Sequence, residues 1–139
     1  MHAMTKSPAV DGWHALIESG DLSRLGDLLA DDVVFHSPVV HTPQRGKALA
    51  TMYLTGAYQV LRNADFRYVR EVVSATDAIL EFEAEIDGIH INGVDMIRWN
   101  ADGKIVDFKV MVRPLKAINL LHAMMRQMLE QLGSKTPPS

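Results

Sequence analysis

The sequence predicts an α+β fold, a cone-shaped curved antiparallel sheet wrapped around N-terminal helices, with an extra C-terminal helix over residues 115–132. Three observations support this. Apolar residues recur at helical spacing in roughly the first 60 residues, alternate with polar ones in roughly the next 50, and then return to helical spacing. Asp87-Gly88 is a strong hairpin signal between two alternating runs. The length of 139 residues suits one domain, expected over residues 8–132, before a disordered tail over 133–139.

Two helices are expected at the start of the chain. Trp13 and Leu16 share one face of a helix over residues 10–19. Gly20 is suited to end this helix, because glycine readily adopts the left-handed conformation. A second helix, over residues 22–29, carries a leucine stripe that also needs a partner surface.

A short strand and a third helix follow. Residues 33–35 are predicted as a strand, closed by Ser37-Pro38. Residues 39–45 are expected to form a loop before a helix over residues 47–61. The apolar faces of all these helices can be buried only against the sheet that the next segment forms.

The central hairpin gives the clearest information about side-chain direction. A strand over residues 78–86 alternates strictly between apolar residues and glutamates. A two-residue turn at Asp87-Gly88 then fixes the register, because both turn positions need positive φ. Counting back pairs Ile86 with Ile89, Ala84 with Ile91, Phe82 with Gly93, and Leu80 with Asp95. An acid therefore lies on the apolar face of the sheet.

Two more strands complete the predicted sheet. A turn over residues 100–103 leads to a strand over residues 105–113, and closing this loop pairs Asp95 with Phe108. An earlier strand over residues 66–73 has no clean alternation, so its faces stay unassigned.

Composition excludes several classes of function. The chain has no cysteine, which rules out disulfides, thiolate metal sites and cysteine nucleophiles. A net charge of −3 without a basic block is unfavourable for binding nucleic acid or an anionic membrane. No apolar run approaches the roughly 18 residues that span a bilayer, so a cytoplasmic protein is expected. Without a glycine-rich phosphate loop or a zinc-like histidine pattern, neither an organic cofactor nor a metal is expected.

The order and spacing of three stretches resemble the nuclear transport factor 2-like superfamily, which includes ketosteroid isomerases and SnoaL-like polyketide cyclases. These stretches are residues 20–38, Gly46 with the helix after it, and residues 94–105, within a resemblance that covers residues 10–114. The resemblance implies a cone that encloses a pocket, and a homodimer formed through the outer sheet face.

The resemblance also assigns residues to roles. Ketosteroid isomerases keep a protonated Asp on the strand before the last hairpin, and Asp95 matches that position. Ser37 stands where these enzymes place their proton-shuttling Asp, and Trp13 where they place an oxyanion-hole Tyr. One of three catalytic parts is therefore retained.

The residues themselves leave two interpretations open. Burial would raise the pKa of Asp95 and let its neutral form donate a hydrogen bond to a developing oxyanion; otherwise Asp95 is a structural acid in a plain core. His41 is the better candidate for a base, because strand alternation turns His36 outward, and Ser37 could orient substrate or water. Loop histidines are otherwise ordinary surface residues.

Apolar and aromatic residues are expected to line the pocket of such a cone. They are Trp13, Phe35, Tyr53, Leu80, Phe82, Trp99, Phe108, Val110 and Val112. On the other face, Val94, Met96 and Met111 lie among charged residues, a mixture that suits a homodimer surface.

The function expected from these features is that of an isomerase, cyclase or hydratase acting by acid–base chemistry on a small apolar, oxygen-bearing substrate. A non-catalytic dimer that binds a small hydrophobic ligand is the second interpretation. The third is an interaction module whose side chains fill the cone.

Overall fold

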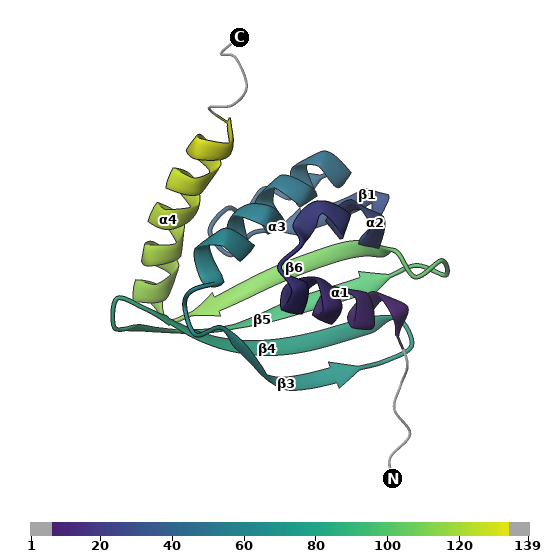
Figure 1. Cartoon of the computed structure of the whole chain (residues 1–139), viewed down its shortest axis with the longest axis horizontal. Coiled ribbons are helices and arrows are strands. Elements are labelled where there is room, and N and C mark those ends of the chain that lie inside the picture. Colours follow the sequence, from purple (N-terminus) through teal and green to yellow (C-terminus); the bar gives the residue numbers. More distant parts are fainter. Residues whose placement is uncertain (1–6, 134–139) are drawn as a thin grey trace.

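The computed structural model describes residues 7–133 (Figure 1). Most of the tail predicted over residues 133–139 lies outside this range. The elements in chain order are α1 (Pro8–Ser19), the 3-10 helix η1 (Leu22–Arg24), α2 (Leu25–Leu28), β1 (Leu29–His36), β2 (Gln44–Arg45), α3 (Lys47–Leu61), β3 (Arg67–Val73), β4 (Asp77–Ile86), β5 (Ile89–Trp99), β6 (Ile105–Arg113) and α4 (Leu115–Gly133). The predicted α+β fold is confirmed.

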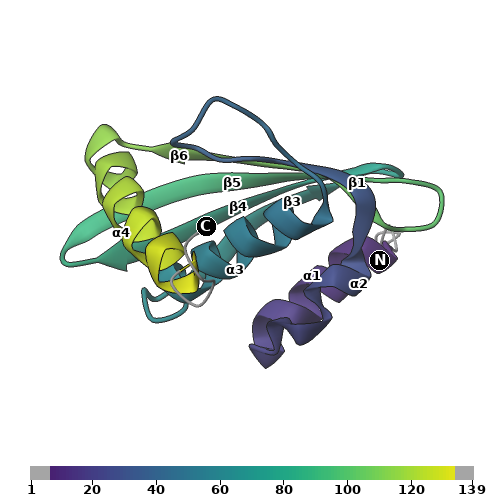
Figure 2. The ribbon, with the colours of Figure 1, turned by 90° about the horizontal axis from the view of Figure 1, so that it is seen from above.

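The six strands form one sheet in the order β2-β1-β6-β5-β4-β3. All neighbours are antiparallel except β1 and β6, which run parallel. Figure 2 shows the curved sheet with α1, α2 and α3 on the same side of it. Helix α4 lies at one end of the sheet, where it contacts α3, β5 and β6. No helix in residues 7–133 is long and apolar enough to cross a membrane.

The register of the central hairpin is confirmed. Ile86 pairs with Ile89, and Leu80 pairs with Asp95. Asp87 and Gly88 have φ values of 51° and 77°, as a two-residue turn of this kind requires. The turn chemistry and the strict alternation of β4 together place Asp95 on the helix-covered face.

The predicted pairing of Asp95 with Phe108 is wrong. Asp95 pairs with Val110, because the register shifts between Arg98 and Trp99. Arg98 pairs with Asp107 and Trp99 with Ile105, which leaves Val106 as an extra residue in β6. The loop closes at Trp99 and Ile105, one residue later than the prediction implies, and the bulge adds one more residue. The total displacement of two residues leaves Asp95 on the same side of the sheet.

The first strand is longer than predicted. Strand β1 begins at Leu29, so the second predicted helix stops one residue earlier. Leu29 pairs with Ile105, and a register irregularity before Val34 accommodates two exposed acids within the strand. The predicted loop over residues 39–45 contains β2, which pairs with β1. The third helix has the predicted bounds.

The core is formed by two clusters of buried side chains. One lies between α1 and the sheet, around Trp13, Leu80 and Phe108. The other lies between α3, α4 and the sheet, around Phe82 and Leu121. Tyr68 and Val110 pack against both clusters, so they mark the region where the two meet.

Candidate active site

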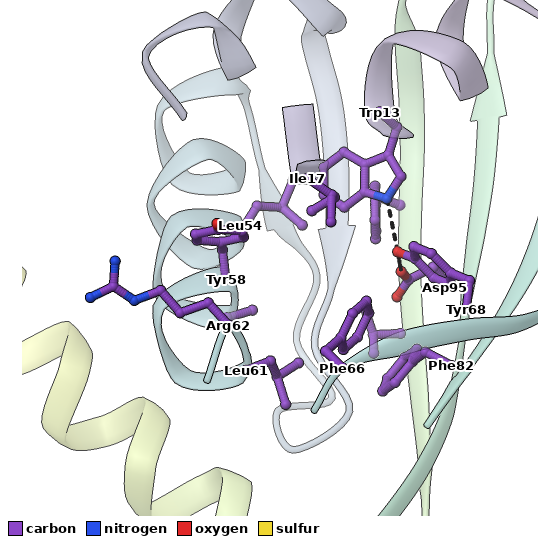
Figure 3. Close-up of a pocket in the computed structure, with 13 residues that line it drawn as sticks. Trp13, Ile17, Leu54, Tyr58, Leu61, Arg62, Phe66, Tyr68, Phe82 and Asp95 are labelled. Atoms are coloured by element: carbon purple, nitrogen blue, oxygen red, sulfur yellow. Dashed lines mark hydrogen bonds between the residues drawn. The ribbon is translucent and has the colours of Figure 1, made fainter. Parts of the chain in front are cut away.

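A cavity of about 200 Å³ lies between α1, α3 and the sheet. Figure 3 shows Trp13, Tyr68 and Asp95 in a row on one side, facing side chains of α3 such as Leu54 and Tyr58. The cavity is partly open to solvent and mostly apolar. Its presence argues against a cone filled by its own side chains.

Asp95 is the carboxyl group of this cavity, and it lies at the end of a hydrogen-bond chain. Its side chain is buried, with 6% of the residue exposed. The Tyr68 hydroxyl donates to Oδ2 of Asp95 over 2.5 Å, and Trp13 Nε1 donates to the Tyr68 oxygen over 2.8 Å. Within residues 7–133, the other carboxyl oxygen, Oδ1, has no hydrogen-bond partner. Oδ1 is therefore free to bind a ligand.

Burial sets the ionisation of this pair. Removal from water raises the pKa of Asp95 from 3.8 to about 7, although the hydrogen bond from Tyr68 lowers it. Burial, and then the negative charge of Asp95, raise the pKa of Tyr68 well above its usual 10. Near neutral pH, Tyr68 thus keeps its proton while Asp95 exists in both forms.

The ring of Tyr68 is held by its neighbours. His14 meets it edge-on with ring centroids 5.4 Å apart, and His14 Nε2 lies 2.9 Å from Oε1 of Glu71. Phe66 contacts another part of the ring, also edge-on, with centroids 5.1 Å apart. These contacts restrict the hydroxyl to the line between Trp13 and Asp95.

The predicted pocket residues fall into three groups. Four line the large cavity: Trp13, Phe82, Phe108 and Val110. Phe35 and Val112 line a smaller neighbouring cavity. Tyr53, Leu80 and Trp99 line neither: Tyr53 stacks on Phe35, Leu80 is fully buried, and the Trp99 indole donates to the Ala75 carbonyl.

The two histidines predicted as possible bases lie away from Asp95. His36 points to the outer side of the sheet, as alternation predicts, and its Nε2 is 2.9 Å from Oδ1 of Asp107. His41 is exposed in the loop before β2. Neither lines a cavity. Ser37 lines the smaller cavity, where its hydroxyl oxygen accepts the Val39 N–H over 3.1 Å.

Sequence reasoning missed Tyr68 and most of the helical wall. The missed lining residues are Ile17, Leu54, Ala57, Tyr58, Leu61, Arg62, Phe66 and Tyr68. Tyr68 lies on β3, the strand that pairs with β4 of the Asp95 hairpin, and this position could have suggested that it faces Asp95. However, a register shift between Tyr68 and Arg70 breaks the alternation of β3, so its side chains could not be assigned to a face.

Replacing Tyr68 by Phe is expected to raise the pKa of Asp95, because the variant removes a hydrogen bond that favours the ionised carboxylate. Any pH-dependent ligand affinity that depends on Asp95 should then shift to higher pH, by roughly one unit for each 1.4 kcal/mol that the bond contributes. Titration of the Asp95 carboxyl carbon by NMR measures this shift directly. Tyr53→Phe is the matched control, since Tyr53 lies outside the cavity. If the pKa of Asp95 is unchanged or lower in Tyr68→Phe, the Tyr68 hydroxyl does not stabilise the ionised carboxylate.

Comparison with known proteins gives a consistent set of similarities. A family model described as a SnoaL-like domain matches residues 10–108. A structure described as a steroid delta-isomerase from Pseudomonas aeruginosa is 37% identical, with a TM-score of 0.86, over 93% of this chain and 99% of that one. An uncharacterised bacterial protein with a cystatin-like fold from Silicibacter pomeroyi is 32% identical, with a TM-score of 0.81, over 92% and 91%.

A third similarity concerns the fold alone. An NTF2-like protein of unknown function from Mesorhizobium loti is 19% identical, with a TM-score of 0.69, over 81% of this chain and 98% of that one. The comparison with curated proteins gives no match.

Proposed function

The chain belongs to the SnoaL-like domain family, and from this premise we propose that it is an enzyme acting by acid–base chemistry on a small apolar, oxygen-bearing molecule. The observation that carries the proposal is Asp95, a buried carboxyl group with one unpartnered oxygen in an otherwise largely apolar cavity. A reaction of isomerase, cyclase or hydratase type suits such a site. The similarity to a protein described as a steroid delta-isomerase supports the isomerase type.

Asp95 can both accept and return a proton near neutral pH. A general acid or base works best when its pKa lies near the working pH, and burial brings Asp95 to about 7. In an isomerisation, ionised Asp95 would take a proton from a carbon next to a carbonyl, and the neutral acid would return it to a different carbon. The substrate's double bond moves, and no atom is gained or lost.

Tyr68 and Trp13 act on Asp95 and need not contact the substrate. The single Tyr68 proton is already donated to Oδ2, and the Trp13 N–H is donated to Tyr68. The Trp13 hydrogen bond also makes Tyr68 a stronger donor. This chain fixes the carboxyl group so that proton transfer falls to Oδ1.

The cavity indicates the class of substrate. An apolar cavity of roughly 150 Å³ can hold benzene, so about 200 Å³ has room for a substituted six-membered ring. Tyr58 adds a second polar contact, since its hydroxyl has no hydrogen-bond partner within residues 7–133. A cyclic ketone or alcohol with apolar substituents fits this lining.

A non-catalytic binding protein is the alternative, and one observation favours it. Among residues 7–133, the side chains that line the cavity of Asp95 include neither His36 nor His41 nor any other histidine. In this alternative, neutral Asp95 anchors a ligand carbonyl without transferring a proton.

Deuterium exchange distinguishes the two functions without knowledge of the natural substrate. We expect the wild-type protein in D₂O to catalyse exchange at the carbons next to the carbonyl of cyclohexenones, followed by NMR. Asp95→Asn keeps the shape and the acceptor for Tyr68 but cannot take a proton, so its exchange rate should fall about a hundredfold or more. His41→Gln is the matched test of the predicted histidine base. Binding without exchange by the wild-type protein would favour the alternative, and a loss confined to His41→Gln would move the base to His41.

The outer sheet face is the surface where we propose that two copies meet. Val72 and Met111 are exposed there by 61% and 50%. Light scattering should then give a dimer mass for the wild-type protein and a monomer mass when both residues are replaced by Lys.

A further inference from the structure

A second cavity, of about 50 Å³, adjoins the first on the side of α4. Four side chains line both cavities: Ala57, Leu61, Phe82 and Val110. Because these walls are shared, a rearrangement of a few side chains can join the two spaces.

The two cavities differ in polarity. Asp95, Tyr68 and Tyr58 line the larger one. In the smaller one, Ser37 is the polar side chain, and its oxygen already accepts the Val39 N–H. A ligand that occupied both would therefore have its oxygen-bearing end in the larger cavity, beside Asp95, and an apolar group at the other end.

Helix α4 forms the far wall of the smaller cavity through Leu121 and Met125. It approaches α3 closely at Gly56, where a Cβ atom would lie 3.3 Å from Cε of Met125. Methionine side chains adopt many conformations at low cost, so Met125 is a movable part of this wall. Helix α4 also lies beyond residues 10–108, the part that matches the SnoaL-like model.

We propose that the two cavities hold one elongated ligand, with its oxygen-bearing end beside Asp95 and a short apolar substituent in the smaller cavity against α4. This inference rests on the proposed function and specifies its substrate class. Val112 and Met125 then determine how long the apolar end can be. Leu61, on the shared wall, separates the two ends.

A series of 4-alkylcyclohexanones from methyl to pentyl tests this proposal by calorimetric titration. Affinity for the wild-type protein should rise about fourfold for each added methylene group that is buried. Val112→Phe and Met125→Phe fill the smaller cavity from β6 and α4. Both should bind 4-methylcyclohexanone within about twofold of wild type and lose the gain for longer chains. Val69→Phe, the same change at an exposed position that lines neither cavity, should behave as wild type.

Leu61→Ala thins the shared wall and should favour the pentyl ligand over the methyl one. This variant decides the question if either filling variant fails to fold, as judged by its melting temperature. Equal gains per methylene in wild type and the folded filling variants, with no change in chain-length preference for Leu61→Ala, would overturn the proposal.

Failure of the second cavity and failure of the proposed function give different results. Suppose that 4-methylcyclohexanone binds and that exchange depends on Asp95. If the variants then leave the chain-length preference unaltered, only the role of the smaller cavity is overturned. If no ketone of the series binds to the wild-type protein, both proposals are overturned.

Discussion

Raising the pH from 4 to 8 is expected to lower the free energy of unfolding by about 4 kcal/mol through Asp95. Burial raises the pKa of this carboxyl from 3.8 to about 7, and each tenfold change corresponds to about 1.4 kcal/mol. Between these two values the folded state holds a proton that the unfolded state has lost, so stability falls as the pH rises through this window. Above about pH 7 the loss is complete and the contribution becomes constant.

Urea unfolding of wild type and Asp95→Asn at each pH unit measures this effect. The difference between them isolates Asp95, because the other titrating groups occur in both proteins. Wild type should lose stability relative to Asp95→Asn between pH 4 and pH 7. Asp102→Asn, a change at an exposed turn position, should follow wild type at every pH. A pH-independent difference between wild type and Asp95→Asn would show that Asp95 ionises as easily in the folded state as in water.

The position of Asp95 could be predicted because two strong local signals agree. The alternation in β4 fixes which side of the strand is buried, and the Asp87-Gly88 turn fixes the register of β5 against it. The β5–β6 pairing lacked such a signal. The longer turn closes one residue later than expected, and the bulge at Val106 adds another residue, so the predicted partner of Asp95 was wrong although the side was right.

Tyr68 could not be placed from the sequence, since the irregularity in β3 removes the period of two. Val69 falls within the register shift and is 46% exposed, so residues on its two sides do not follow one alternation. The hydrogen-bond partner of Asp95 was therefore missed, although Asp95 itself was found.

The helical wall of the cavity was missed for another reason. Helix α3 is covered by the sheet on one side and by α4 on another, so its apolar surface is too wide to show which part faces the cavity. Tyr53 was expected at the cavity and instead stacks on Phe35, whereas Leu54 and Tyr58 line it.

Gly93→Ala should destabilise the protein by about 3 kcal/mol and close both cavities. A Cβ atom at position 93 would collide with Cζ of Phe82 and would lie 2.7 Å from the Met111 carbonyl oxygen. The backbone oxygen is fixed in the sheet, so the ring of Phe82 must move, and overpacking of this kind costs about 1–3 kcal/mol. Phe82 lines both cavities, and its displacement should therefore reduce ketone binding as well as stability.

Gly12→Ala is the matched control for this change. Its new Cβ would approach Cδ2 of Leu28 as closely as 2.6 Å, but that methyl group is the end of a flexible side chain. The substitution lies within α1, where alanine is favoured over glycine by roughly 1 kcal/mol, so little stability should be lost. Adding Phe82→Leu to Gly93→Ala should recover part of the stability, because the shorter side chain removes one of the two clashes. Urea unfolding of the three variants measures these differences. If Gly93→Ala and Gly12→Ala lose the same free energy of unfolding, a side chain at position 93 does not displace the Phe82 ring.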